Sequence, residues 1–402
     1  MKLQHFRTSI KETIRNHVPN TRFFQKELAK ARLREVNRYD EIENEVLSSQ
    51  RRDDPDFKQQ IVKKCIDKWP QKAARVKADC MEKINRAPAY LGRSEDEALL
   101  ADMLYSFFAL GFAAEEYVYY KLENKSVDER QTFLGDRVRF RYHCSLNNLI
   151  DSSVFTDKVR TYRRFEPFFK REALEIRNAG DFPAFEQFVK RHPRFVCKNV
   201  FEACGRGVRL VDSASCGKTV REQFDEMVSD TKYIVEEVIR QSEIMAAFND
   251  TSVNTVRFVT MTTEDGIETP FSFFRVGAKG SFVDNAGSGG CVSGVDTSCG
   301  RIETMGYDEY GSSYVCHPGS GKQFEGFQIP DWDSLVRVAK EAAAKVPGVK
   351  IVGWDFAHTD DGWVLVEGNA MSQIGVLQIA YQRGMRADFE RFFRKMKPIL
   401  PL

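Results

Sequence analysis

The stretch IVGWDFAHTDDGWVLVEGNAM, residues 351–371, reads as two strands joined by a tight turn. Apolar, β-branched and aromatic residues fill both halves, and the Asp361-Gly362 pair between them is a strong hairpin signal. The register of such a hairpin places Asp355 close to Glu367, with Asn369 at the end of the second strand. Two carboxylates on an apolar sheet repel each other and lose hydration unless a cation lies between them. The pattern therefore predicts a Mg²⁺ site, with solvated acids on an exposed hairpin edge as the alternative.

The length and composition of the chain narrow the class of protein. At 402 residues the chain is too long to fold around a single small hydrophobic core, which predicts two or three domains. It contains no apolar run long enough to span a bilayer, and its first residues, MKLQHFRTSIKETIRNHV, lack the apolar segment of a secretory signal. Its nine cysteines include no C-x-x-C pair, which favours reduced thiols over a disulfide framework or a zinc site. We therefore expect a cytoplasmic protein.

The charge is unevenly distributed along the chain. Residues 1–90 contain 21 Lys and Arg against 13 Asp and Glu, whereas the whole chain has a net charge of only +2. A basic arm on a mildly acidic body suggests an acidic partner, such as a membrane surface, a polyanionic glycan or nucleic acid. The alternative is a solvated helical face. We favour it because acids are interspersed throughout this segment and aromatic residues are sparse.

The predicted secondary structure changes near residue 150, from helices alone to strands among helices. Residues 1–90 predict several basic helices separated at Pro55 and Pro70, and residues 91–150 predict a more hydrophobic helical region packed on the core. Ser94 and Glu97 fit a capping box at the start of one helix over 94–122. Beyond residue 150, strands such as 194–200, 233–239, 254–262 and 270–277 alternate with helices, one of them over 331–346. This mixture predicts an α/β or α+β fold.

Several polar residues interrupt these apolar strands. Lys198 lies within FVCKNV, and a lysine in such a strand requires an anion. The turn that follows carries Gly205, Arg206 and Gly207, which suits close approach to phosphate, although a tight hairpin explains the glycines equally well. Neither a P-loop nor a G-x-G-x-x-G motif before a helix occurs in the sequence.

Charged residues also mark three later strands. Glu236 and Glu237 follow an apolar run, and one of them, if turned inward, could accept hydrogen bonds from ribose hydroxyls. Arg257 and Arg275 each lie within an apolar strand. Inward-facing arginines on a sheet need carboxylate or phosphate partners, and structural ion pairs are the competing explanation.

The loop over residues 283–302 is rich in glycine and polar residues, as is typical of loops that hold an anion or close over a substrate. Its candidate substrate residues are Asp284, Asn285, Ser288, Gly289 and Gly290. His317 lies in a second turn-rich loop, where a structural or substrate-contacting role is favoured over that of a catalytic base. No Ser/His/Asp constellation or G-x-S-x-G motif is present.

Taken in chain order, these pieces resemble the ATP-grasp superfamily over roughly residues 150–385. Lys158 in FTDKVRTYRRF is similar to its first phosphate-side lysine, and FVCKNVFEACGRGVRLV is similar to its second lysine strand with a glycine-rich flap. YIVEEVI resembles its nucleotide hinge, and DFAHTDDGWVLVEGNAM resembles its metal-binding end. The motifs NTVRFVT, VDNAGSGG and CHPGSG resemble the sugar-transfer-associated branch.

The resemblance implies an ATP-grasp fold of two α+β subdomains, residues 151–235 and 236–402, behind a helical N-terminal region. It implies ATP and one or two Mg²⁺ ions, and a carboxylate–amine ligase that forms an acyl phosphate on a small-molecule or sugar-linked substrate. A phosphotransferase acting on a hydroxyl is the alternative, and a nucleotide-binding interaction protein is a third. The helical first 150 residues differ from the βαβ domain that precedes many ATP-grasp modules.

The same resemblance implies a role for each candidate residue. Lys158 and Lys198 would bind phosphates under the 205–207 flap, and Glu236, Glu237, Val238 and Ile239 would hold adenine and ribose. Arg257, Arg275 and Lys198 would be catalytic, Asp284, Asn285, Ser288, Gly289, Gly290 and His317 would contact substrate, and Asp355, Glu367 and Asn369 would hold the metal.

Overall fold

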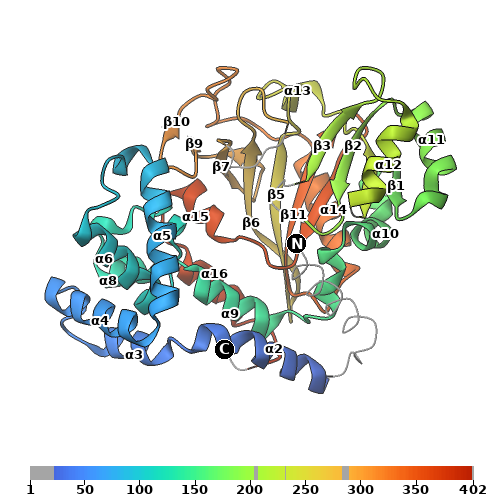
Figure 1. Ribbon diagram of the computed structural model, residues 1–402. Coiled ribbons are helices and arrows are strands. Elements are labelled where there is room, and N and C mark those ends of the chain that lie inside the picture. The colour runs from blue at the N-terminus through green and yellow to red at the C-terminus, as the bar shows by residue number, and fades with distance from the viewer. Residues whose placement is uncertain (1–21, 203–206, 231, 283–288, 401–402) are drawn as a thin grey trace.

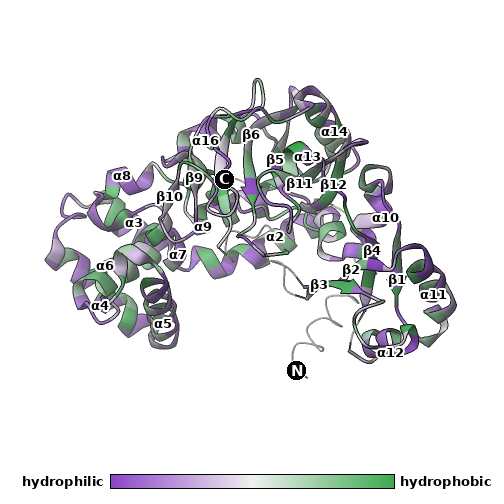
Figure 2. Cartoon of the chain, turned by 90° about the horizontal axis from the view of Figure 1, so that it is seen from above, coloured by the Kyte–Doolittle hydropathy of each residue, from purple (hydrophilic) through white to green (hydrophobic). Residues whose placement is uncertain are grey.

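The computed structural model describes residues 22–202, 207–230, 232–282 and 289–400 (Figure 1). Within these ranges the chain forms a helical N-terminal region, a four-stranded sheet and an eight-stranded sheet. Seen from above, the helical region and the four-stranded sheet lie at opposite ends of the molecule, with the eight-stranded sheet between them (Figure 2). No helix in the described ranges is long and apolar enough to cross a bilayer.

The N-terminal region consists of short helices, as predicted. Pro55 and Pro70 each occupy the first position of a helix, where the missing N–H of proline costs nothing. The helices are α2 (Arg22–Asn37), α3 (Asp40–Ser48), α4 (Pro55–Lys68), α5 (Pro70–Arg86), η1 (Pro88–Tyr90), α6 (Glu97–Tyr105), η2 (Ser106–Leu110), α7 (Ala114–Tyr119), η3 (Leu122–Asn124), α8 (Val127–Gln131) and α9 (Asp136–Leu146).

The predicted helix over 94–122 is wrong in two respects. Its capping residue is Asp96, whose carboxylate accepts a hydrogen bond of 3.1 Å from the Leu99 N–H, so Ser94 does not cap it. The helix also stops at Gly111, whose φ of 80° lies in the left-handed region that ends helices. A second, shorter helix, α7, then completes the segment.

The four-stranded sheet is antiparallel throughout, in the order β1-β4-β2-β3. Phe185 and Phe188 of α11 and Phe224 of α12 pack with the apolar side chains of this sheet, which gives it a core of its own. Its elements are β1 (Ala173–Ile176), η5 (Ala179–Asp181), α11 (Phe182–Arg191), β2 (Arg194–Asn199), β3 (Val208–Asp212), α12 (Val220–Asp230) and β4 (Tyr233–Glu237).

The eight-stranded sheet has the order β10-β9-β7-β6-β5-β11-β12, with β8 paired to β7. Its strands are β5 (Thr255–Thr263), β6 (Gly266–Val276), β7 (Cys291–Asp296), β8 (Arg301–Ile302), β9 (Gly306–Tyr307), β10 (Ser313–Tyr314), β11 (Ile351–Thr359) and β12 (Gly362–Asn369). The helices around it are η4 (Asp151–Thr156), α10 (Lys158–Phe169), α13 (Glu243–Ala246), α14 (Trp332–Ala344), α15 (Gly375–Tyr381) and α16 (Arg386–Phe393).

Each face of this sheet is buried in a different core. Val256, Phe258 and Trp354 point to the face covered by α10, α13 and α14. Val259 and Ile351 point to the opposite face, where one hydrophobic cluster joins the sheet to the N-terminal helices and to α15 and α16. Successive side chains alternate between faces, so residues two apart share one. The face packed against the N-terminal helices is therefore the one that carries Arg257, two residues before Val259, and Asp355, four after Ile351.

Candidate functional site

The hairpin at residues 351–369 brings Asp355 close to Glu367, as predicted, with a β-bulge between Asp355 and Phe356 that shifts the register by one residue. β11 and β12 are antiparallel, with Asp355 opposite Glu367 and Gly353 opposite Asn369. Gly362 closes the turn with a φ of 86°, which favours glycine at this position. The hairpin thus brings two carboxylates and an amide together at one end of the sheet.

Asp355 is paired with two arginines from neighbouring strands. Its side chain is buried, Arg257 on β5 contacts both of its oxygens, and Arg275 Nη1 on β6 lies 2.8 Å from Oδ2. Burial opposes ionisation, but the charges of Arg257 and Arg275 hold the pKa of this carboxyl well below its usual range. The ion pairs that the sequence left as the competing explanation for both arginines are therefore present.

Glu367 has a different environment from its partner. Half of its side chain is exposed, its Oε1 accepts a hydrogen bond of 3.1 Å from Asn369, and Arg257 Nη2 lies 3.9 Å away. Partial burial and the neighbouring charge of Asp355 raise the pKa of Glu367, while Arg257 opposes the shift. A cation beside Glu367 would relieve the repulsion between these carboxylates.

Part of this donor set fits a hard divalent cation: Glu367 is half exposed and lies beside Asn369, whereas both Asp355 oxygens already contact arginines. Asp355, Glu367 and Asn369 present oxygen donors from two adjacent strands, and oxygen is the ligand atom that Mg²⁺ prefers. Among the described residues no group of three or more His, Cys, Asp or Glu is placed to hold a metal, so a site here depends on the two carboxylates and the amide.

Lys158 lies between the two sheets, at the first position of α10. Asp157 caps this helix by accepting hydrogen bonds from Val159 and Arg160. The Lys158 ammonium donates to the backbone carbonyls of Asn199, at 2.8 Å, and Glu202. Burial lowers the pKa of Lys158. The charge of Glu367 on the other sheet opposes that shift, and Lys198 adds to it. Lys158 thus lies within electrostatic reach of both the second lysine and the hairpin acids.

Lys198 and Glu236 form a buried ion pair across β2 and β4. Lys198 Nζ lies 2.9 Å from Glu236 Oε2, and Arg171 Nη2 lies 2.6 Å from the same oxygen. These two cations outweigh desolvation and lower the pKa of Glu236 to about 2. Of the two neighbouring glutamates, Glu236 is the one that faces inward, but its carboxylate is already paired with Lys198 and Arg171. The sequence did not point to Arg171, since it lies just before a strand among other charged residues.

The remaining hinge residues lie at the end of β4. Glu237 accepts a hydrogen bond of 3.2 Å from the Glu172 N–H, and Val238 and Ile239 follow the strand, half-buried. Their predicted contacts with adenine and ribose remain predictions.

Both glycine-rich loops are described only in part. Gly207 has a φ of 67°, which lies in the left-handed region that favours glycine. Gly205 and Arg206 lie outside the described residues, as do Asp284, Asn285 and Ser288. Gly289 and Gly290 precede β7.

His317 makes structural contacts in the loop after β10, and its predicted contact with substrate remains a prediction. It is buried, and its ring nitrogens lie 3.1 Å from the Gly277 carbonyl and 3.2 Å from the Ser320 hydroxyl. Burial lowers the pKa of this imidazole. Its side chain ties the loop after β10 to the end of β6.

The sequence did not point to a set of polar residues on α9 that fixes the open end of the hairpin, where β11 starts and β12 ends. Asn147, at the end of this helix, is fully buried. Its Nδ2 donates to the carbonyls of Ala370, at 2.8 Å, and Ile351, at 3.2 Å, and its Oδ1 accepts from the Ile351 N–H at 2.9 Å. One side chain therefore holds the start of β11 beside the end of β12, next to Asn369.

His143 and Arg139 extend this contact along the same helix face. His143 Nε2 lies 3.1 Å from the Ser372 carbonyl, and Arg139 Nη1 donates to the Met371 carbonyl at 3.1 Å. Burial lowers the pKa of His143 to about 3, so the ring is neutral at physiological pH. Spacings of four residues place all three side chains on one helix face, and this spacing was the signal available in the sequence.

Comparison with known proteins gives a family match and remote structural similarities. The model of the family described as "Sugar-transfer associated ATP-grasp" matches residues 137–393, more than half of the chain. No curated protein matches the chain. A solved structure of the ATP-grasp ligase PsnB complexed with minimal precursor is 14% identical, covers 60% of this chain and 62% of its own, and has a TM-score of 0.37.

Two further solved structures show similarity of the same order. The D-alanine-D-alanine ligase from Coxiella burnetii is 10% identical over 63% of this chain and 60% of its own, with a TM-score of 0.39. The N5-carboxyaminoimidazole synthetase from Staphylococcus aureus, complexed with ADP, is 8% identical over 55% and 46%, with a TM-score of 0.36. The chain thus spans between about half and two thirds of the length of these structures. On the strength of the family match, the chain belongs to the sugar-transfer-associated ATP-grasp family, with a helical region before its ATP-grasp domain.

Proposed function

We propose that the protein is an ATP- and Mg²⁺-dependent ligase that joins a carboxylate to an amine on a small-molecule or sugar-linked substrate. The observation that carries the proposal is the position of Lys158. This half-buried lysine lies within electrostatic reach of Lys198 on one sheet and of Glu367 on the other. Two lysines opposite a carboxylate pair form an arrangement suited to a nucleotide triphosphate and its metal.

The lysines bind and orient the nucleotide in this proposal. Lys158 and Lys198 neutralise phosphate oxygens, and Glu236 with Arg171 keeps the Lys198 ammonium at the sheet surface. Asp355, Glu367 and Asn369 would hold Mg²⁺. When bound, the ion neutralises charge on the phosphates. Adenine and ribose would lie along residues 236–239, at the end of β4.

The two arginines supply positive charge where the acyl phosphate forms. The substrate carboxylate attacks the γ-phosphorus and ADP leaves. The amine then attacks the acyl carbon, phosphate leaves, and the nitrogen loses one proton to solvent. Arg257 and Arg275 lie on adjacent strands against Asp355, which holds their guanidinium groups in fixed positions, and the developing charge would lie beside them. Catalysis of this kind depends mainly on positioning and electrostatics.

Product analysis tests this proposal. The full chain is incubated with ATP, Mg²⁺ and a panel of uronic acids and amino acids, and the products are identified by mass spectrometry. We expect ADP, free phosphate and an amide in equal amounts. A phosphorylated acceptor without free phosphate would instead identify the phosphotransferase alternative.

Nucleotide binding provides the matched control. Lys198→Met should weaken ADP binding at least tenfold, whereas Lys190→Met, at an exposed lysine of α11, should leave it unchanged. Equal ADP affinity in the wild type and Lys198→Met would contradict the site assignment.

A further inference from the structure

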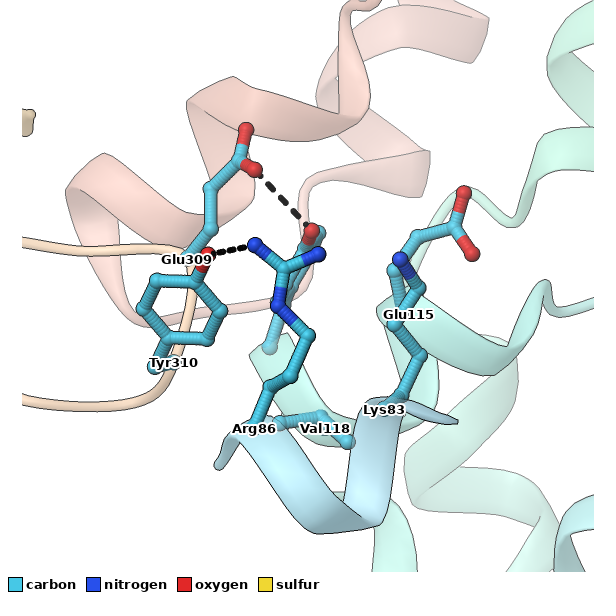
Figure 3. A pocket seen from close by; sticks show the side chains of 7 residues that line it. Lys83, Arg86, Glu115, Val118, Glu309 and Tyr310 are labelled. Atoms are coloured by element: carbon cyan, nitrogen blue, oxygen red, sulfur yellow. Dashed lines mark hydrogen bonds between the residues drawn. The ribbon is translucent and has the colours of Figure 1, made fainter. Parts of the chain in front are cut away.

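A cavity of about 80 Å³ lies between the helical region and the loop that joins β9 to β10 (Figure 3). One water molecule needs about 10–15 Å³ of such space, so the cavity has room for a group of several heavy atoms. It is lined by Lys83 and Arg86 from α5, Glu115 and Tyr119 from α7, and Glu309 and Tyr310 from the loop.

The charges around this cavity balance. Arg86 spans it by donating a hydrogen bond to the Tyr310 hydroxyl on the loop side (Figure 3), but among the described residues the cations and the carboxylates form no ion pair with one another across it. Lys83 and Arg86 each form an ion pair with Glu82 on their own helix, at 3.6 and 3.4 Å. In the described part of the chain, no salt bridge joins either cation to Glu115 or Glu309. Two cations and two carboxylates therefore face one space, where a ligand carrying both charges can satisfy them.

The loop side of the cavity is held in place by Asp308. This buried carboxylate accepts hydrogen bonds from the N–H groups of Tyr310, at 2.8 Å, and Ser312, at 2.9 Å, and from the Tyr314 hydroxyl. Glu309 accepts a hydrogen bond of 3.1 Å from Tyr119. The Glu309 carboxylate thus has a fixed position before any ligand arrives, which lowers the entropic cost of binding.

The cavity belongs to the same side of the molecule as the reaction centre. The cross-strand register runs from Arg275 on β6 to Val292 on β7 and then to Tyr307 on β9, two residues before Glu309. Directly opposed residues share a face of the sheet. Burial raises the pKa of Glu309, and the hydrogen bond from Tyr119 and the charge of Arg275 oppose that shift. Glu309 is therefore within electrostatic reach of the arginine that pairs with Asp355.

We propose that this cavity is the subsite for the amine substrate and that it takes a small zwitterion, an α-amino acid or the α-amino-acid end of a larger molecule. The ligand's carboxylate would pair with Lys83 and Arg86, and its ammonium with Glu115 and Glu309. The ammonium would give one proton to one of these two carboxylates before the free amine attacks the acyl phosphate. The proposal rests on the ligase function above, and it gives the helical region a role as one wall of the acceptor site.

Calorimetric titration of the full chain tests this subsite. The probes are glycine, L-alanine, L-serine, L-aspartate and L-lysine, with propionate and ethylamine as the analogues of alanine that lack one charge. We expect at least one amino acid to bind. Alanine, if it is among those that bind, should exceed both analogues at least tenfold. Glu309→Gln and Lys83→Met should each weaken amino-acid binding at least tenfold. Lys77→Met on α5 and Glu325→Gln, both at exposed residues, are the matched controls.

The outcomes for the subsite and for the ligase function are distinguishable. A chain that binds none of these amino acids, or whose Glu309→Gln and Lys83→Met variants bind as well as the wild type, overturns the subsite, and the charges then serve only the contact between helices and loop. ADP titration of the same samples reports on the nucleotide site. If the wild type does not bind ADP, the proposed ligase function is wrong. A measured affinity for an amino acid would still support the subsite.

Discussion

Glu236 and Lys198 form an ion pair of 2.9 Å between neighbouring strands, and Arg171 contacts the same carboxylate oxygen. All three side chains are largely withdrawn from water. One carboxylate therefore holds two cations at the inner surface of the four-stranded sheet. This arrangement fixes the position of the lysine that we propose binds phosphate, so we expect both the stability of the protein and nucleotide binding to depend on Glu236.

Glu236→Gln should destabilise the protein by about 3–5 kcal/mol at pH 7, because it leaves two buried cations without their anion. Urea unfolding measures the change. The control is Glu237→Gln. The neighbouring carboxylate accepts a backbone hydrogen bond from Glu172 and forms no ion pair within the described residues. A loss of only about 1 kcal/mol is expected there. Equal losses in the two variants would show that the ion pairs contribute little.

The pH dependence of stability should carry a contribution from Glu116 on α7. This buried carboxylate accepts hydrogen bonds from the N–H groups of Ala113 and Asp136, both at 2.9 Å. Burial, followed by the charge of Asp136, raises the pKa of Glu116 to about 8. The folded state therefore binds a proton more tightly than the unfolded state, so stability should fall as the pH rises from about 4.5 to 8.

Glu116→Gln should remove most of this pH dependence, because an amide oxygen can accept the same two hydrogen bonds without a charge. We expect the variant to match the wild type near pH 5 and to exceed it by a few kcal/mol at pH 8, in urea unfolding at each pH. Glu95→Gln, at an exposed position, should keep the wild-type slope. An unchanged slope in Glu116→Gln would show that Glu116 is ionised throughout this range.

The hairpin of residues 351–369 was predictable because its signals are local. Alternating apolar residues and an Asp-Gly turn predict both strands and their regular pairing next to the turn. The pairing of Asp355 with Glu367 also needs the β-bulge between Asp355 and Phe356, without which Asp355 would lie opposite Val366. Thr219 and Glu222, three residues apart before α12, form a capping box with hydrogen bonds of 2.8 and 3.2 Å, which is likewise a local arrangement. Gly111, by contrast, ends a helix inside an apolar run, where the spacing of apolar residues does not indicate that the helix stops.

The partners of the charged residues were not predictable in the same way. Arg171 and Glu236 are separated by 65 positions, and Asn147 and Ala370 by 223, so their contacts arise from tertiary packing. The sequence showed that Arg257 and Arg275 needed anions, but their shared partner, Asp355, depends on the order β6-β5-β11. Local patterns indicated which residues required partners, and the strand order determined which partners they have.

Asn147→Ala should cost at least about 2 kcal/mol, because the carbonyls of Ile351 and Ala370 and the Ile351 N–H lose a buried partner. The same change should weaken ADP–Mg²⁺ binding, since the 370–372 turn directly follows Asn369. Asn44→Ala, at an exposed position of α3, is the control for stability. Wild-type affinity for ADP–Mg²⁺ in a folded Asn147→Ala variant would show that α9 does not position the site.

Glu367→Gln should separate nucleotide binding from metal binding. The variant keeps the shape of the side chain but removes its negative charge. That charge lies beside Asp355, and a bound cation would relieve the repulsion between the two carboxylates. In the wild type we expect Mg²⁺ to strengthen ADP binding at least tenfold, about 1.4 kcal/mol, and EDTA to reverse the gain. In Glu367→Gln the gain should be lost, while ADP alone binds through Lys158 and Lys198 as before. Asp361→Asn changes an exposed acid in the turn of the same hairpin, and it should respond to Mg²⁺ like the wild type. A full Mg²⁺ effect in Glu367→Gln would place the metal elsewhere and leave Asp355 as the ion-pair partner of Arg257 and Arg275 alone.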